Sequence, residues 1–228
     1  MPTRSPAARA SGRNPSLRVD VVLFTARDGA LHVLLVATGS ASPRERWTVP
    51  SGAIRRGESV DDTAARIARD ALGTTPTHLE QAGVRGGARR TAQPVVTVAY
   101  SGLAPVGTPA RAGASWLPVS EAGALALRDR DEIDRSIGAI RARIDHQPIA
   151  FRLLPDVFTL SELQAVYEIL LGRPLHKASF RRSLHAAAIV EATDEWRTER
   201  RGRPAQLFRY APPRRRRIRR GVRFDLLG

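Results

Sequence analysis

Residues 47–73 read WTVPSGAIRRGESVDDTAARIARDALG, and this stretch decides the fold of the first half of the chain. It begins as a loop that contains Gly52 and continues with apolar residues at helical spacing across 59–72. Asp61 and Asp62 stand in the first turn, where the helix dipole favours acids, and Gly73 is typical of a helix end. The stretch therefore predicts a loop that leads into an amphipathic helix.

Short β-branched and apolar runs surround this helix. Residues 19–24 and 31–36 are two of them, and Asp28-Gly29 between them is typical of a hairpin turn. Further strands are expected at about 79–85, 94–101 and 114–118, and a second helix at about 130–145. The mixture predicts an α+β class with a sheet packed by few helices.

After residues 146–148 the pattern changes to helix, helix and hairpin. Residues 159–162 read TLSE, a capping box, and apolar residues follow it at helical spacing: Leu160, Leu163, Val166, Tyr167 and Leu170. Gly172 and Pro174 end that helix, and a second helix is expected at about 176–187. Strands at 189–191 and 205–210 flank an arginine-bearing loop. This order predicts a winged helix-turn-helix.

Composition and charge limit the function classes. The chain has no cysteine and no apolar run close to the roughly 18 residues that a membrane span needs, and we expect a cytoplasmic protein without a cofactor. Of the net charge of +15, residues 151–228 supply +9, from 17 basic and 8 acidic side chains. An excess of arginine at a chain end indicates a polyanionic partner.

The spacing of Gly52, Glu58, Arg66 and Gly73 resembles the Nudix box, G-x5-E-x7-R-E-U-x-E-E-x-G-U, and residues 47–52 resemble its W-x-L-P-G-G lead-in. In that family, glutamates after the arginine face one another across a divalent metal that activates water. The resemblance implies a Nudix-like α/β/α sandwich for residues 17–147, a domain for ligand sensing and dimerisation.

The carboxylates of the box are damaged here. Ile67 and Ala71 occupy two of the three glutamate positions, and Asp70 shortens the third. Because apolar groups cannot ligate magnesium, we expect no catalytic residues, no metal and no hydrolysis. Glu58 and Arg66 then remain as ligand contacts or as a structural ion pair. The alternative is a Nudix hydrolase acting on a nucleoside diphosphate derivative, with a weak cation at Glu58 and Asp70.

The C-terminal half resembles the NrtR family of Nudix-related transcriptional regulators. Residues 153–174 resemble its LLP-x-x-F-T-L-x-x-L-Q-x-x-Y-E block, residues 180–182 its N-F-R-R block, and residues 201–210 its G-R-P-A-x-L-Y-R block. The resemblance implies a homodimeric repressor that binds a palindromic operator on double-stranded DNA, commonly of NAD-metabolism genes. It also implies an effector such as ADP-ribose. The chain then divides into a disordered basic arm (1–16), the Nudix-like domain (17–147), a winged helix (148–211) and an arginine-rich tail (212–228).

One departure from that family concerns the effector. Where members carry a stretch like R-D-P-R-G-R-V-V-S-V-A-Y, residues 89–100 read RRTAQPVVTVAY. Arg85, Arg89 and Arg90 remain as a candidate anion-binding cluster, and the alternative is a solvated loop. The predicted ligand-binding residues are Glu58, Arg66, Asp70, Arg85, Arg89 and Arg90.

The second helix of the winged motif would read DNA. With Phe180 and Leu184 turned inward, Arg182 is placed to pair with guanine, and Lys177 or Arg181 to bind phosphate. Arginines of the wing would follow the backbone or enter the minor groove. The predicted DNA-binding residues are Lys177, Ser179, Arg181, Arg182, His185, Arg200, Arg201 and Arg203. A third possibility is an architectural DNA binder whose Nudix-like domain only dimerises.

Overall fold

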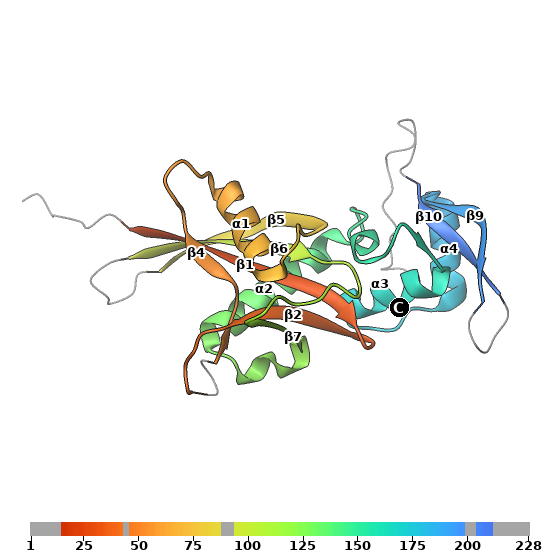
Figure 1. Ribbon diagram of the computed structural model, residues 1–228. Helices are drawn as coiled ribbons and strands as arrows, with labels where there is room; N and C mark the ends of the chain where they lie inside the picture. The colour runs from red at the N-terminus through yellow and green to blue at the C-terminus, as the bar shows by residue number, and fades with distance from the viewer. Residues whose placement is uncertain (1–14, 43–45, 88–93, 199–203, 212–228) are drawn as a thin grey trace, which may run out of the picture.

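The computed structural model describes residues 15–42, 46–87, 94–198 and 204–211 (Figure 1). The first predicted hairpin is confirmed, with β1 over Ser16–Arg27 and β2 over Ala30–Ala37. Asp28 and Gly29 between them have φ values of 50° and 73°, the left-handed conformations that a tight hairpin turn requires. The tail, most of the arm, and the predicted site residues Arg89, Arg90, Arg200, Arg201 and Arg203 lie outside the described residues.

A seven-stranded mixed sheet forms the first domain. Its main path runs β3-β2-β1-β6-β5, while β4 pairs with β1 and β7 with β2. Strands β1 and β6 are parallel, and the other pairs are antiparallel. The predicted strands are confirmed as β5 (His78–Gly87), β6 (Val95–Leu103) and β7 (Ala114–Pro118). The two short strands β3 (Trp47–Thr48) and β4 (Ser51–Ala53) fall inside the stretch expected to be a loop.

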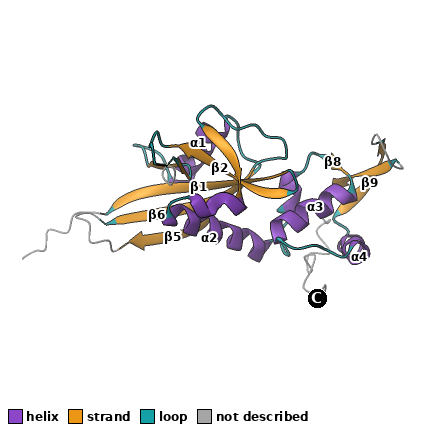
Figure 2. Ribbon diagram, turned by 90° about the horizontal axis from the view of Figure 1, so that it is seen from below, coloured by secondary structure: helices purple, strands orange, loops and turns teal. Residues whose placement is uncertain are grey.

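Two helices cover opposite faces of this sheet (Figure 2). Helix α1 spans Val60–Leu72, as predicted, with Ser59 as N-cap in a capping box with Asp62. Helix α2 spans Leu127–Arg143 and follows the 3-10 helix η1, Val119–Ala124. Because side chains alternate along β1, Val21 and Leu23 pack on the α1 face, and Val22 and Phe24 on the α2 face. This arrangement is the expected α/β/α sandwich.

The second domain is a winged helix at one end of the sheet (Figure 1). After the 3-10 helix η2 (Ala150–Leu153) come β8 (Val157–Phe158), α3 (Leu160–Leu171), α4 (Lys177–Ala187), β9 (Val190–Arg197) and β10 (Ala205–Tyr210). Thr159 and Glu162 form the predicted capping box, and Gly172 ends α3 at φ 71°. The sheet has the order β8-β10-β9, and β9 extends well beyond the three residues predicted for it.

One apolar core runs through both domains. Ile133 and Ile137 of α2 belong to the same cluster of buried residues as Leu163 and Val166 of α3. Helix α3 contacts both α2 and β2, and the Val106 amide donates to the Leu153 carbonyl at 2.9 Å. The winged helix is therefore packed against the first domain through α3 and η2. No helix among the described residues is long and apolar enough to cross a membrane.

Candidate functional sites

The Glu58 carboxylate is fully engaged at the start of α1. Arg66 donates to it twice, from Nε to Oε1 at 2.7 Å and from Nη2 to Oε2 at 2.9 Å. The Thr63 hydroxyl and the Arg55 amide also donate to Oε2, at 2.9 and 3.1 Å. The Arg66 bonds are the main cause that lowers the pKa of Glu58 to about 2. Glu58 and Arg66 thus form an ion pair that joins the loop before α1 to this helix.

The other Nudix-box positions do not complete a metal site among the described residues. The Asp70 side chain is 63% exposed, and its carboxylate lies 3.9 Å from Arg66 Nη1. Ile67 and Ala71 are buried in the apolar cluster between α1 and the sheet. Within the described part of the chain, no group of three or more His, Cys, Asp or Glu is arranged to hold a metal ion. The Arg66 guanidinium therefore lies beside the carboxylates of both Glu58 and Asp70.

Arg85 lies on the opposite face of the sheet from α1. It pairs across the strands with Thr97, and its guanidinium contacts the Glu132 carboxylate of α2. The structure therefore divides the predicted ligand-binding residues between two faces: Glu58, Arg66 and Asp70 on one, Arg85 on the other. Their joint role in one ligand site remains a prediction.

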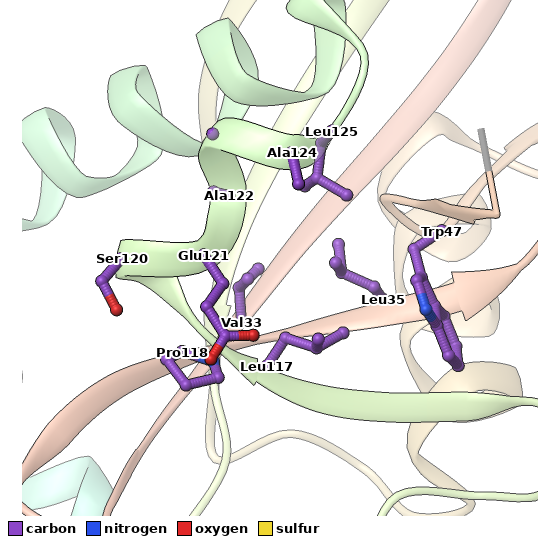
Figure 3. A pocket seen from close by; sticks show the side chains of 11 residues that line it. Val33, Leu35, Trp47, Leu117, Pro118, Ser120, Glu121, Ala122, Ala124 and Leu125 are labelled. Atoms are coloured by element: carbon purple, nitrogen blue, oxygen red, sulfur yellow. The ribbon is translucent and has the colours of Figure 1, made fainter. Parts of the chain in front are cut away.

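The face that carries Arg85 holds a pocket that the sequence did not reveal (Figure 3). Its volume is about 430 Å³, and its walls come from β2, the start of β3, the end of β7 and η1. Most lining side chains are apolar, and Glu121 and Trp47 provide a carboxylate and an indole. The sequence signal for this pocket is Trp47, which belongs to the Nudix lead-in.

On the same face of the sheet, a cluster of charged side chains lies between β1 and α2. The buried Asp20 carboxylate accepts from Arg18 Nε at 2.9 Å and also pairs with Arg128. Arg18 further donates to Ser51, the residue that replaces a family glycine. Burial raises the pKa of both Asp129 and Glu132, the two acids of α2 in this cluster. No sequence pattern had brought these residues together, because they come from distant segments.

Helix α4 presents a cationic face. Phe180 and Leu184 are fully buried, as predicted, which turns Arg182 and His185 outward. Lys177 and Arg181 are exposed as well. Ser179 is only partly exposed, and its hydroxyl lies 3.2 Å from His176 Nδ1. A helix with an apolar inner side and an exposed basic side is suited to lie in a major groove.

The wing strand β9 is tied to α3. Arg197 of β9 donates to Glu162 Oε1 at 2.5 Å, while Oε2 of the same carboxylate accepts from the Thr159 amide. Trp196 beside it is 60% exposed. Glu162 therefore caps α3 and also holds the end of β9 near the start of the helix-turn-helix.

These features define a class of protein: a Nudix-type domain joined to a winged helix that carries a basic reading helix. The family model described as NUDIX domain matches residues 15–137, and the one described as NrtR DNA-binding winged helix domain matches residues 150–210. The chain belongs to the NrtR family.

Three known proteins resemble the chain over most of its length. The ADPR responsive transcriptional repressor NtrR of Acinetobacter baylyi is 28% identical over 208 residues, which are 87% of this chain and 83% of that protein. Shewanella oneidensis NrtR, solved in complex with a 27mer DNA, is 32% identical with a TM-score of 0.75, covering 86% of this chain and 93% of that one. A MutT/nudix family protein from Enterococcus faecalis shares the fold, at 22% identity and a TM-score of 0.68 over 88% of this chain and 89% of its own.

Proposed function

We propose that this chain is a DNA-binding transcriptional repressor whose Nudix-type domain responds to ADP-ribose or a related nucleotide. The observation that carries the proposal is the exposed basic face of α4, with Lys177, Arg181 and Arg182 outside and Phe180 and Leu184 buried. A relative of the same family was solved with DNA, and another is an ADPR-responsive repressor. We further propose that the chain acts as a homodimer on a palindromic operator, with NAD-metabolism genes as targets.

The Nudix-type domain acts in this proposal as a sensor and not as a hydrolase. Hydrolysis of a diphosphate needs several carboxylate oxygens around magnesium. Here Ile67 and Ala71 are buried apolar residues, and Glu58 is bonded to Arg66. Incubation with ADP-ribose and Mg²⁺ is expected to give a flat time course of product release. Robust Mg²⁺-dependent turnover would favour the hydrolase alternative instead.

The DNA-binding proposal is tested by fluorescence anisotropy with the promoter region beside the chain's own gene. We expect tighter binding to this DNA than to a scrambled duplex at physiological salt, and a change in affinity when ADP-ribose is added. Arg182→Gln should remove most of the preference, because one bidentate contact to a base discriminates by about 1 to 3 kcal/mol. Arg69→Gln on the exposed side of α1 is the matched control. Equal binding of both duplexes by the unaltered chain would refute the proposal.

A further inference from the structure

We propose that the edge strand β9 of the winged helix binds the arginine-rich tail of the same chain, residues 212–228, through Asp194, Glu195 and Trp196. The surface that β9 offers lies on neither α4 nor the sensor domain. The contact competes with DNA for the arginines of the tail. That consequence rests on the proposed function, whereas the contact itself is tested without DNA.

Strand β9 is an edge strand that faces solvent. In the described part of the chain it pairs with β10 alone, and Figure 1 shows it on the side of the winged helix that faces away from the large sheet. Asp194 and Glu195 are exposed, and the Trp196 side chain is 60% exposed. An exposed edge strand is a surface along which another segment can lie. Tryptophan is enriched at such interfaces because its large apolar ring also carries a polar N–H.

The charge of β9 is opposite to that of α4. The strand carries three exposed acids, Glu191, Asp194 and Glu195, and its single arginine, Arg197, is engaged by a carboxylate of α3. Glu191 is paired with Arg209 at 3.0 Å. Among the residues that the structure describes, no ion pair engages Asp194 or Glu195. Such a strand repels DNA phosphates and attracts a cationic segment.

The tail is a cationic segment that begins beside this strand. Residues 212–228 contain seven arginines and one acid. The Ala211 amide donates to the Ile189 carbonyl at 2.9 Å, so the tail starts next to the first residue of β9. The run 214–217 lies three to six residues beyond Ala211, a reach of about 10 to 20 Å. Asp194 and Glu195 lie five and six residues beyond Ile189, about 16 to 20 Å along the strand.

The side chains of β9 suit arginine in particular. A carboxylate accepts two parallel bonds from a guanidinium, and a guanidinium also stacks on an indole face. Glu195 and Trp196 are consecutive, so one short stretch offers both kinds of contact. The only lysine of the chain, Lys177, lies outside the tail. Because the tail is tethered to β10, its local concentration at β9 is on the order of millimolar, and individually weak contacts are sufficient.

The contact would tune how the protein binds DNA. Arginines that bind phosphates add affinity for any duplex without reading its sequence. When the same arginines are held by Asp194 and Glu195, this sequence-independent affinity falls, while the contacts of α4 to bases are unchanged. The acidic strand therefore raises the share of the binding energy that depends on the operator sequence.

The first test measures acrylamide quenching of tryptophan fluorescence in the full chain, where acrylamide is chosen because it is uncharged. The signal of Trp196→Phe is subtracted to isolate Trp196. Raising the salt from about 0.1 M to 1 M shortens the screening length from about 10 Å to 3 Å and should increase the quenching of Trp196 about twofold. A tail variant should be fully quenched at both salt concentrations; it combines Arg214→Gln, Arg215→Gln, Arg216→Gln and Arg217→Gln.

Equal quenching of the tail variant and the unaltered chain at low salt would overturn the proposal. If both chains then show the same protection of Trp196, another occupant such as a second copy covers β9. Thermal unfolding of each variant checks that it is folded.

The second test measures binding to a scrambled duplex by anisotropy. Asp194→Asn combined with Glu195→Gln should bind about fivefold tighter than the unaltered chain, because the tail is released to the DNA. In the tail variant the same pair of substitutions should change the affinity little. Asp131→Asn combined with Asp134→Asn is the matched control, since it removes two exposed acids of α2.

A gain in affinity that persists in the tail variant would mean that the acids of β9 repel DNA directly, and it would overturn the proposed contact. If no chain binds any duplex, the repressor proposal fails instead, and the quenching experiment still decides whether β9 holds the tail.

Discussion

Arg66 holds Glu58 through two bonds of 2.7 and 2.9 Å, and this pair joins the Nudix-box loop to the helix that follows. Because the pKa of Glu58 is lowered to about 2 from an ordinary 4.5, the pair contributes stability above pH 4.5 that is lost as the pH falls toward 2. We expect Glu58→Gln to have a lower melting temperature than the unaltered chain at pH 7. The difference in melting temperature between the two chains should shrink as the pH falls from 4.5 to 2.

Thermal unfolding followed by circular dichroism at several pH values checks this. Asp62 also has a lowered pKa, but it is present in both chains, so its effect cancels in the difference. Asp70→Asn is the control, since that carboxylate is exposed and 3.9 Å from Arg66. A gap between Glu58→Gln and the unaltered chain that is constant down to pH 2 would contradict the prediction.

Restoring the first missing carboxylate should destabilise the domain. Ile67 is 5% exposed, and its Cδ1 lies only 3.3 Å from where a Cβ on Gly52 would stand. A glutamate there would place an unpaired charge in an apolar cluster, at a cost of about 3 to 5 kcal/mol. Urea unfolding of Ile67→Glu measures this loss in the free energy of unfolding. The control Ile67→Val is expected to lose only about 0.5 to 1.5 kcal/mol. An Ile67→Glu variant as stable as Ile67→Val would show that this position can accept a charge.

Much of the fold could be predicted from local sequence. Short β-branched apolar runs predicted β1 and β2, apolar residues at helical spacing with Asp61 and Asp62 in the first turn predicted α1, and a capping box with Thr159 predicted the start of α3. These signals are local, so a single sequence carries them. The strands β3, β4 and β8 are two or three residues long and exist only through pairing with distant strands, which leaves no periodicity to detect.

The candidate sites also differ in how far local sequence could predict them. The outward face of α4 followed from helical spacing around Phe180 and Leu184. The face of the sheet on which Arg85 lies could not be predicted in this way. It depends on a register shift in the pairing of β5 with β6 between Gln81 and Gly83. The cluster around Asp20 could not be predicted either, because Asp20 and Arg128 are 108 residues apart in the sequence.

Two side chains of α4 should affect DNA binding differently. Lys177→Gln is expected to weaken binding to any duplex and to reduce the slope of log affinity against log salt by about 1, since it removes a phosphate contact. Arg182→Gln should instead reduce the preference for the promoter over scrambled DNA. Anisotropy titrations over a range of salt concentrations separate the two effects. Identical salt slopes for Lys177→Gln and the unaltered chain would exclude Lys177 as a phosphate contact.

Arg141 is expected to fix the position of the helix-turn-helix relative to the sensor domain. It extends from α2, and its Nε donates at 2.9 Å to the carbonyl of Leu170, one of the last carbonyls of α3 that lack an intrahelical partner. Its Nη2 lies 2.6 Å from where a Cβ on Gly172 would stand, so a side chain at position 172 would displace this end of the guanidinium. Apolar packing alone is non-directional, whereas this bond fixes a register between α2 and the turn that precedes α4.

Arg141→Gln should therefore loosen the domain orientation and weaken binding to the promoter DNA a few-fold. The chain has no cysteine, so spin labels can be placed by Arg69→Cys on α1 and Ala186→Cys on α4 without background. Dilution with excess unlabelled chain suppresses distances between subunits. We expect a broader distance distribution in Arg141→Gln and in Gly172→Ala.

Arg143→Gln is the matched control on the same helix, because Arg143 pairs with Glu80 inside the sensor domain at 2.9 Å. If the distribution stays narrow in both test variants, the apolar junction between α2 and α3 is sufficient to hold the two domains, and Arg141 has no positioning role.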